Sequence, residues 1–302
     1  MSCVRSSLFA LARPAAATFR IAQAISFRAL TTQAAAAPKR GDLTPAQAAF
    51  LARTGFNFSA KLLKQATTHK TYKDGKVPHS EQLQYFGEQV LDLYVTEYIH
   101  AKYPNLPPAT LRDAVAAYTS TATLSMLGKS IGVQDVMRWE PQEVSGKDSE
   151  ARMQAKITKA LIGALYKAQG AVAAKKFIHA ALLAKDMDLA PLLPLDEPKR
   201  ALSALLKRQG RERPVSRMLH ETGRHSSAPV FVVGAFSGLD KIGEGAGSSI
   251  KMAEYRAAKD ALLKYYLHTR VNPPLPSDTE AMPHAERNAY VGAPLGDTPA
   301  IL

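Results

Sequence analysis

The strongest constraint on the fold is a change in the spacing of apolar residues at a proline-rich stretch near residue 190. Before it, apolar residues recur at helical intervals, as in the run from Leu83 to Tyr98. After it, residues 229–236 (PVFVVGAF) have the β-branched and aromatic content of a strand. No single periodicity runs through the chain. The sequence therefore predicts an all-α domain followed by a small α+β domain.

The expected boundaries follow from these patterns. The helical domain spans 43–190, a linker spans 191–198, the second domain spans 199–270, and a proline-rich tail without periodicity spans 271–302. The tail is expected to be poorly ordered. The predicted helices of the first domain are 80–102, 111–131, 153–166 and 171–183. The second domain reads α-β-β-β-α: helix 199–209, strands 214–221, 229–236 and 240–244, a glycine-rich turn at 243–247, and a helix capped by Ser248 or Ser249.

Charge is concentrated at the N-terminus. The chain has a formal charge of +13, and residues 1–40 contribute six Lys or Arg residues and no acid. An Arg-, Ser- and Ala-rich segment of this kind is typical of a mitochondrial transit peptide. A basic arm that binds nucleic acid is the alternative. The basic balance of the whole chain indicates an anionic partner, such as nucleic acid or a membrane surface.

The composition disfavours proteins that depend on cysteine and proteins that span a membrane. The only cysteine, Cys3, lies in the segment that import would remove, which leaves no thiol for disulfides, zinc ligands or a nucleophile. No stretch approaches the roughly 18–20 apolar residues of a membrane span. We therefore expect a protein without a membrane span.

Three blocks of the helical part share residues and spacing with one enzyme family. They are 68–72 (THKTY), 80–91 (SEQLQYFGEQVL) and 155–166 (AKITKALIGALY). Together they resemble ribonuclease III, whose catalytic domain is all-helical and works as a dimer. The resemblance implies that four positions correspond to the acidic metal ligands of active members: Gln84, Glu88, Lys156 and Lys159.

Only Glu88 is acidic among these four residues. Mg²⁺ in a nuclease requires hard anionic oxygen ligands. An ammonium group about 4 Å from Mg²⁺ costs on the order of 8 kcal/mol at an effective dielectric near 20. We therefore expect no bound metal, no cofactor and no catalytic residue, and the chain is interpreted as a non-enzyme.

Lys156 and Lys159 have several possible roles. On helices with 100° per residue, Glu81, Gln84 and Glu88 lie within roughly a 60° arc, and Lys156 and Lys159 share a face. The lysines then form ion pairs with Glu88 or Glu81, or they point toward RNA phosphate. Ordinary solvated helix residues are the simplest alternative. A nuclease with a rebuilt site is a further alternative, although no other acid occupies a matching position.

Residues 197–268 resemble a double-stranded-RNA-binding domain, through PVFVVGAF and the block GEGAGSSIKMAEYRAAKDAL. Such domains read duplex shape and backbone with little sequence preference. The resemblance implies contacts from the loop residues Arg224 and His225, and from Ser248, Ser249 and Lys251 at the start of the last helix. The family has two adjacent basic residues where this chain has Ile250 and Lys251, and each lost phosphate contact weakens binding. A protein-interaction domain with the same fold is the alternative.

The transit-peptide-like segment, the helical domain and the duplex-RNA-binding domain occur together in one group. The chain thereby resembles the fungal mitochondrial large-subunit ribosomal proteins that combine these two domains. This implies a structural role in the mitochondrial matrix, bound to large-subunit ribosomal RNA and other subunit proteins. It also implies a second ribonuclease III-like ribosomal protein as heterodimer partner. The alternative function is a non-ribosomal mitochondrial RNA-binding or processing factor, or a silent subunit of a ribonuclease III-type nuclease.

Overall fold

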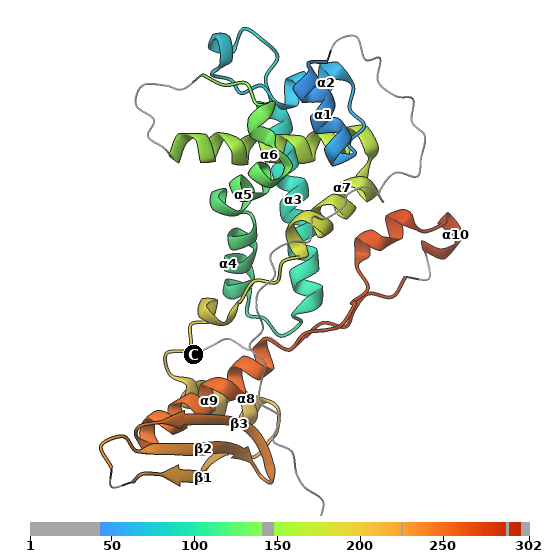
Figure 1. Cartoon of the computed structure of the whole chain (residues 1–302). Helices are drawn as coiled ribbons and strands as arrows, with labels where there is room; N and C mark the ends of the chain where they lie inside the picture. Colours follow the sequence, from blue (N-terminus) through green and yellow to red (C-terminus); the bar gives the residue numbers. More distant parts are fainter. Residues whose placement is uncertain (1–42, 141–147, 225, 288–289, 297–302) are drawn as a thin grey trace, which may run out of the picture.

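The computed structural model describes residues 43–140, 148–224, 226–287 and 290–296. A helical domain lies above a small sheet-containing domain, and a narrow neck joins them (Figure 1). The order of elements confirms the all-α and α-β-β-β-α classes predicted from the sequence. The elements are α1 Pro45–Thr54, α2 Ala60–Ala66, η3 Tyr72–Gly75, α3 Glu81–Lys102, α4 Pro108–Tyr118, α5 Thr121–Ile131, η4 Val133–Asp135, α6 Asp148–Gln169, α7 Ala171–Ile178, a π-helical turn η5 His179–Leu183, η6 Ala190–Leu192, α8 Pro198–Arg208, β1 Pro214–Thr222, β2 Val230–Ser237, β3 Asp240–Gly247, α9 Ile250–Tyr266, η7 Pro276–Ala281 and α10 His284–Arg287.

Two long helices, α3 and α6, cross at a pair of glycines and organise the helical domain. A Cβ atom on Gly87 would lie 1.9 Å from the backbone oxygen of Lys159. One on Gly163 would lie 2.3 Å from the backbone oxygen of Leu83. Since no side chain fits between the two backbones, only glycine permits this approach. The crossing brings the ribonuclease III-like blocks 80–91 and 155–166 into contact.

The core of the helical domain fills in around this crossing. Its fully buried side chains come from every part of the domain, namely Phe50, Phe58, Leu63, Leu91, Tyr94, Ile99, Leu124, Ile157, Leu161, Ile162 and Leu165. An aromatic cluster closes one end, where the Phe56 ring lies 5.1 Å from the rings of both Phe58 and Phe177. None of the described helices has the length and apolar character needed to cross a membrane.

The helix predicted over 111–131 is two helices in the structure. Helix α4 ends at Tyr118 and α5 begins at Thr121. Ser120 separates them because its side chain accepts a hydrogen bond from the backbone N–H of Thr123 at 3.2 Å, which caps a new helix. The apolar period continues across the break, so periodicity alone did not reveal it.

The small domain packs two helices against one face of an antiparallel sheet with strand order β1-β2-β3. The stretch 243–247, predicted as a glycine-rich turn, instead forms the second half of β3. Its three glycines face α9, where a Cβ on Gly243 or Gly245 would lie 2.4 or 2.3 Å from α9 backbone atoms. The alanines of α9 complete this close contact, and they are Ala253, Ala257, Ala258 and Ala261.

The stretch 191–198 links the domains, but it is not a free linker. Leu193 and Leu195 are buried in the main core, and the backbone oxygen of Leu195 accepts a hydrogen bond from the Tyr255 hydroxyl on α9. The linker therefore packs along its length.

The expectation of a poorly ordered tail is wrong for residues 271–287. This segment contains η7 and α10 and returns to the helical domain, where Ser277 contacts Glu97 on α3 and Asp278 pairs with Lys175 on α7. Proline removes helical periodicity from a sequence without preventing such contacts, so the sequence pattern did not reveal this order.

Candidate functional site

The crossing of α3 and α6 brings together the residues at the four positions that correspond to the metal ligands of ribonuclease III. The Nζ atom of Lys159 lies 2.7 Å from Oε1 of Glu88 and donates a hydrogen bond to it. The Lys159 side chain is 18% exposed and that of Glu88 is 37% exposed, so the pair is partly shielded from water. The single carboxylate of the set is thus already bound to a cation within the chain.

A second acid lies one turn beyond Glu88 on α3. Burial raises the pKa of Asp92, and the negative charge of Glu88 raises it further, while Lys159 opposes the shift. The charge of Lys159 therefore acts on two carboxylates of α3, and its ammonium group is bound directly to that of Glu88.

Lys156 is placed differently. It is half-buried, and within the described residues it makes no ion pair or hydrogen bond. Burial lowers the pKa of His69, and the charges of Lys156 and then Lys70 lower it further. Glu81 pairs with Lys70 at 3.1 Å rather than with either lysine of α6. The predicted internal pairing therefore holds for Lys159 with Glu88, and Lys156 leaves a free positive charge beside His69.

This donor set does not fit a divalent metal ion. Its four positions offer one carboxylate, which is already bound to Lys159, together with the amide of Gln84 and the ammonium of Lys156, which has no partner among the described residues. Within the described ranges, no three His, Cys, Asp or Glu side chains cluster as metal ligands would. The arrangement lacks the anionic oxygens that Mg²⁺ requires.

The predicted RNA-binding residues of the small domain lie on two structural features. Lys251 is exposed in the first turn of α9. Ser249 is the N-cap, where its side chain accepts from the Met252 N–H at 3.2 Å, and the hydroxyl keeps its own proton to donate to a ligand. Ser248 lies exposed beside it. At the other feature, the loop after β1, Arg224 is exposed and pairs with Glu221 at 3.5 Å, while the predicted His225 lies outside the described residues.

Sequence reasoning missed the exposed face of α8, which the fold places next to the start of α9. Lys199 on α8 pairs with Glu254 on α9, so the two helix starts share one surface. Further along α8, Ser203 and Lys207 are also exposed. Their spacing of four residues was readable from the sequence, but its meaning depends on the neighbouring helix.

An exposed apolar surface on the helical domain was also missed. Tyr85 and Leu93 on α3 are 69% and 63% exposed, and Phe86 between them is 42% exposed. The Phe86 ring meets that of Tyr166 edge-on at 5.4 Å, beside a depression of about 500 Å³ also lined by Gln82. We call Tyr85, Phe86 and Leu93 the apolar α3 surface. Large exposed apolar residues that cluster in this way mark interaction sites.

Comparison with known proteins agrees with both domains. A family model described as Ribonuclease-III-like matches residues 59–186, and a model described as the MRPL44 dsRNA-binding domain matches residues 193–291. Ribonuclease 3 of Limosilactobacillus fermentum is 33% identical over 223 residues, which cover 71% of this chain and 95% of that protein. The chain belongs to the ribonuclease III family.

A second relative has a different name. The large ribosomal subunit protein mL44 of Neurospora crassa is 46% identical over 128 residues, 42% of this chain. The match spans 29% of the length of that protein. Together with the two domain models, it confirms the resemblance to mitochondrial large-subunit ribosomal proteins that was drawn from the sequence. Among solved structures, the nuclease domain of ribonuclease III from Campylobacter jejuni matches with 24% identity and a TM-score of 0.39, covering 45% of this chain and 94% of that one.

Proposed function

We propose that the chain is a structural component of the mitochondrial large ribosomal subunit, where it binds ribosomal RNA and does not cleave it. The observation that carries this proposal is the pairing of two matches in one chain. A stretch of 128 residues is 46% identical to mL44 of Neurospora crassa, and residues 193–291 match the model described as the MRPL44 dsRNA-binding domain.

The absence of nuclease activity is supported by the chemistry of the α3–α6 crossing. The bacterial relatives named Ribonuclease 3 align along most of this chain, so the scaffold is shared. At this crossing Lys159 binds Glu88 directly, and Gln84 and Lys156 supply no anionic oxygen. Without these anionic oxygens, the residues at the crossing do not hold the metal ion that would polarise a phosphate ester.

RNA binding is assigned to the surface shared by α8, the start of α9 and the β1–β2 loop. Lys251, Lys207 and Arg224 are exposed there, and the backbone N–H groups at the start of α9 point outward from a helix N-terminus. Several of the neighbouring charges are already paired, including Lys199 with Glu254 and Arg224 with Glu221. The contact is therefore modest by itself and suits one fixed RNA helix within an assembly.

The protein partner is assigned to the apolar α3 surface. We infer that a second ribonuclease III-like ribosomal protein packs against Tyr85, Phe86 and Leu93 as a heterodimer partner. Large, rigid aromatic side chains of this kind supply most of the binding energy at protein interfaces. Other large-subunit proteins complete the assembly around it.

The N-terminal segment gives the proposed location. Residues 1–40 are read as a transit peptide, and they lie outside the described residues. A reporter fused to residues 1–30 should enter mitochondria, and a chain that lacks them should remain in the cytosol. A reporter that stays in the cytosol would contradict this location and favour the basic-arm interpretation.

A second candidate is a silent subunit of a ribonuclease III-type nuclease, or another non-ribosomal mitochondrial RNA-binding factor. It is favoured by the alignment with Ribonuclease 3 over 95% of the length of that enzyme. Sedimentation of mitochondrial extract in Mg²⁺ separates the two candidates. A ribosomal component migrates with the large subunit, whereas a free factor or a nuclease subunit migrates in lighter fractions.

The RNA contact is tested by the same sedimentation with charge variants. Lys251→Glu replaces an attraction to phosphate by a repulsion, at a cost of about 1–3 kcal/mol. The fraction that co-sediments with large subunits should fall, and fall further as salt rises. Lys176→Glu, on an exposed position of α7, is the matched control. If Lys251→Glu assembles like the control at every salt concentration, this surface does not bind the RNA.

A further inference from the structure

The chain does not stop at the end of the small domain but crosses back to the helical domain. Residues 269–281 leave α9, run along the neck and reach α7, as Figure 1 shows in orange-red. We call this segment the C-terminal strap. It is the second covalent crossing between the domains, after the linker at residues 191–198.

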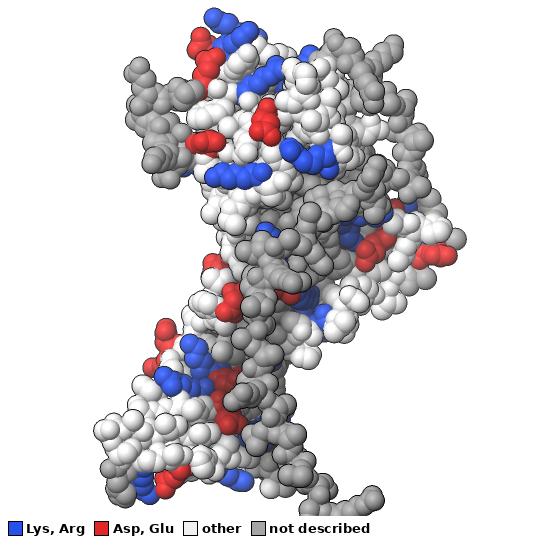
Figure 2. Space-filling view, viewed as in Figure 1, with Lys and Arg blue, Asp and Glu red and all other residues white. Residues whose placement is uncertain are grey.

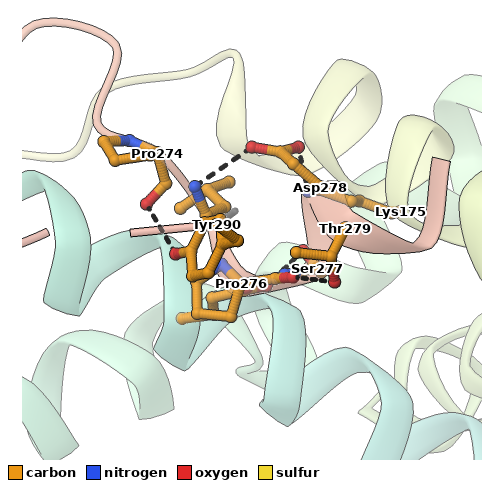
Figure 3. A network of polar contacts seen from close by, with 9 residues as sticks. Lys175, Pro274, Pro276, Ser277, Asp278, Thr279 and Tyr290 are labelled. Carbon is orange, nitrogen blue, oxygen red and sulfur yellow. Dashed lines mark hydrogen bonds and ion pairs between the residues drawn. The ribbon is translucent and has the colours of Figure 1, made fainter. Parts of the chain in front are cut away.

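The far end of the strap is fixed to the helical domain by a polar network (Figure 3). The backbone N–H and the hydroxyl of Ser277 donate hydrogen bonds to the two carboxylate oxygens of Glu97, both at 2.6 Å. Asp278 pairs with Lys175 on α7 at 2.5 Å, and the Lys175 side chain is only 12% exposed. Two helices of the helical domain therefore hold adjacent residues of the strap.

The strap is also shaped to fit this position. Its Leu275 side chain is buried, and the Leu275 N–H donates to Oδ2 of Asp278 at 3.0 Å. Burial and, after it, the negative charge of Glu280 raise the pKa of Tyr94 on α3, which places a third strap residue against the same helix. The returning chain adds a contact from the Tyr290 hydroxyl to the backbone oxygen of Pro274.

The near end of the strap is fixed at the neck. The Arg270 N–H donates to the backbone oxygen of Lys102 at 2.9 Å, at the end of α3. Beside it, Asn105 of the helical domain donates to the backbone oxygen of Tyr265 on α9 at 3.3 Å. Arg270 also holds the returning chain through a hydrogen bond from its guanidinium to the backbone oxygen of Pro294 at 2.7 Å.

Two crossings restrict motion in a way that one does not. Domains joined by one connection and a small interface move relative to each other by default. The linker at residues 191–198 is anchored by Leu193 and Leu195, but a single crossing still leaves rotation about it as the least restricted motion. A second crossing, held at the neck and again at α7, removes that rotation.

We propose that the C-terminal strap locks the RNA-binding domain in one orientation relative to the helical domain. The locked angle would present the α8–α9 surface and the apolar α3 surface at a set separation, so that an RNA helix and a protein partner are engaged together. The simultaneous binding of an RNA helix and a protein partner rests on the proposed function, whereas the fixed orientation of the two domains does not.

The test measures the distance between the domains in the isolated protein. Residues 43–302 contain no cysteine, so a chain with Cys3→Ser accepts spin labels at two chosen sites. Lys129→Cys on α5 and Leu239→Cys in the β2–β3 turn are exposed positions on opposite domains. Double electron–electron resonance then reports the distribution of distances between the labels.

Three forms are compared with the labelled parent. The first ends after Thr269 and lacks the strap contacts at α7. The second keeps the strap but carries Lys175→Ala and Ser277→Ala, which remove the ion pair and the hydroxyl contact. The third is the control Lys176→Ala, which changes an exposed lysine on the same helix. Circular dichroism verifies that each form is folded.

The parent and the control should give one narrow distance distribution, and the two strap variants a distribution about twice as wide. A broad distribution in the parent overturns the proposal, and so does a truncated or double-variant chain that stays as narrow as the parent. No RNA or ribosome is present, so a failure here leaves the proposed RNA contact standing, and a failure in sedimentation leaves the strap standing.

Discussion

Lys159 on α6 donates a 2.7 Å hydrogen bond to Glu88 on α3, directly beside the point where the two helix backbones touch. The ion pair and the close glycine contact thus stabilise the same crossing. Figure 2 shows the positive and negative side chains dispersed over the visible face of the helical domain. The pair at the crossing is distinguished by its partial shielding from water.

Breaking this pair should destabilise the helical domain. Lys159→Ala leaves Glu88 without its cation and should lower the free energy of unfolding by about 1–2 kcal/mol, between the values for exposed and buried pairs. Urea denaturation measures the change, with Lys167→Ala on the exposed end of α6 as the control. The charge swap Lys159→Glu with Glu88→Lys should recover part of the loss. If the swapped protein loses as much unfolding free energy as Lys159→Glu and Glu88→Lys lose together, the pair does not stabilise the crossing.

The crossing itself should tolerate no added atom. Gly163→Ala places a Cβ 2.3 Å from the Leu83 backbone oxygen, and neither helix backbone can shift without disturbing the core. We expect a loss of about 3 kcal/mol or more in unfolding free energy. Gly128→Ala is a graded comparison, because its Cβ would be too close to a side-chain atom, the Thr158 hydroxyl at 2.7 Å, and would meet backbone only at an ordinary 3.6 Å. Equal losses in the two variants would argue against a special contact at Gly163.

The purified protein should not cleave duplex RNA in Mg²⁺ or Mn²⁺. Three of the four residues at the positions of the family's metal ligands lack a carboxylate, and the fourth, Glu88, is bound to Lys159. A gel assay with radiolabelled duplex RNA measures this directly. Cleavage that disappears in Glu88→Ala would contradict the prediction. The triple change Gln84→Glu, Lys156→Asp and Lys159→Glu should restore metal binding, detectable by calorimetry, without full activity.

The apolar α3 surface should matter for assembly and not for folding. Leu93→Glu alters a side chain that is 63% exposed, so its effect on stability should stay within about 0.5 kcal/mol. The fraction of protein in large subunits should nevertheless fall, because a charge would enter the partner interface. Leu239→Glu, at a 91% exposed position on the other domain, is the control. Equal incorporation of the two variants would rule out this surface as the interface.

Stability should fall below pH 6.5. Burial lowers the pKa of His179, and Lys175 lowers it further against the opposing charges of Glu97 and Asp278. Burial likewise lowers the pKa of His69. Below the ordinary value of about 6.5, the unfolded chain binds protons that the native protein does not. The contribution of the two neutral histidines to the free energy of unfolding is therefore complete above pH 6.5. It is lost as the pH falls toward the lowered pKa values that they have in the folded protein. Urea denaturation at pH 7.5 and 5.5 should show this slope, and His69→Gln with His179→Gln should flatten it. An unchanged slope would contradict the assignment.

The sequence predicted what depends on local pattern. The helix ending before Tyr103, the strand over 229–236 and the serine cap of the last helix all follow from the spacing of apolar residues and from cap chemistry. The pairing of Lys159 with Glu88 was one of two roles predicted for the lysines of α6, because helical spacing already placed them on a single face.

Features that depend on a distant neighbour were not predictable. Residues 243–247 read as a turn because glycine is frequent in turns, yet here glycine makes room for α9. The exposure of Tyr85 and Leu93 cannot be read from a helical pattern, since it depends on which faces other helices cover. The strap was missed for the same reason, because its order comes from contacts on α3 and α7.

The bond between Ser277 and Glu97 joins residues 180 positions apart in the chain, and this separation affects how the protein matures. Contacts between such distant positions form late, since closing a long loop costs conformational entropy before the contact forms. While the chain is synthesised from the N-terminus, the helical domain folds before Ser277 and Asp278 are available to Glu97 and Lys175. A chain that ends before residue 277 would therefore lack these contacts in a domain that starts near residue 43.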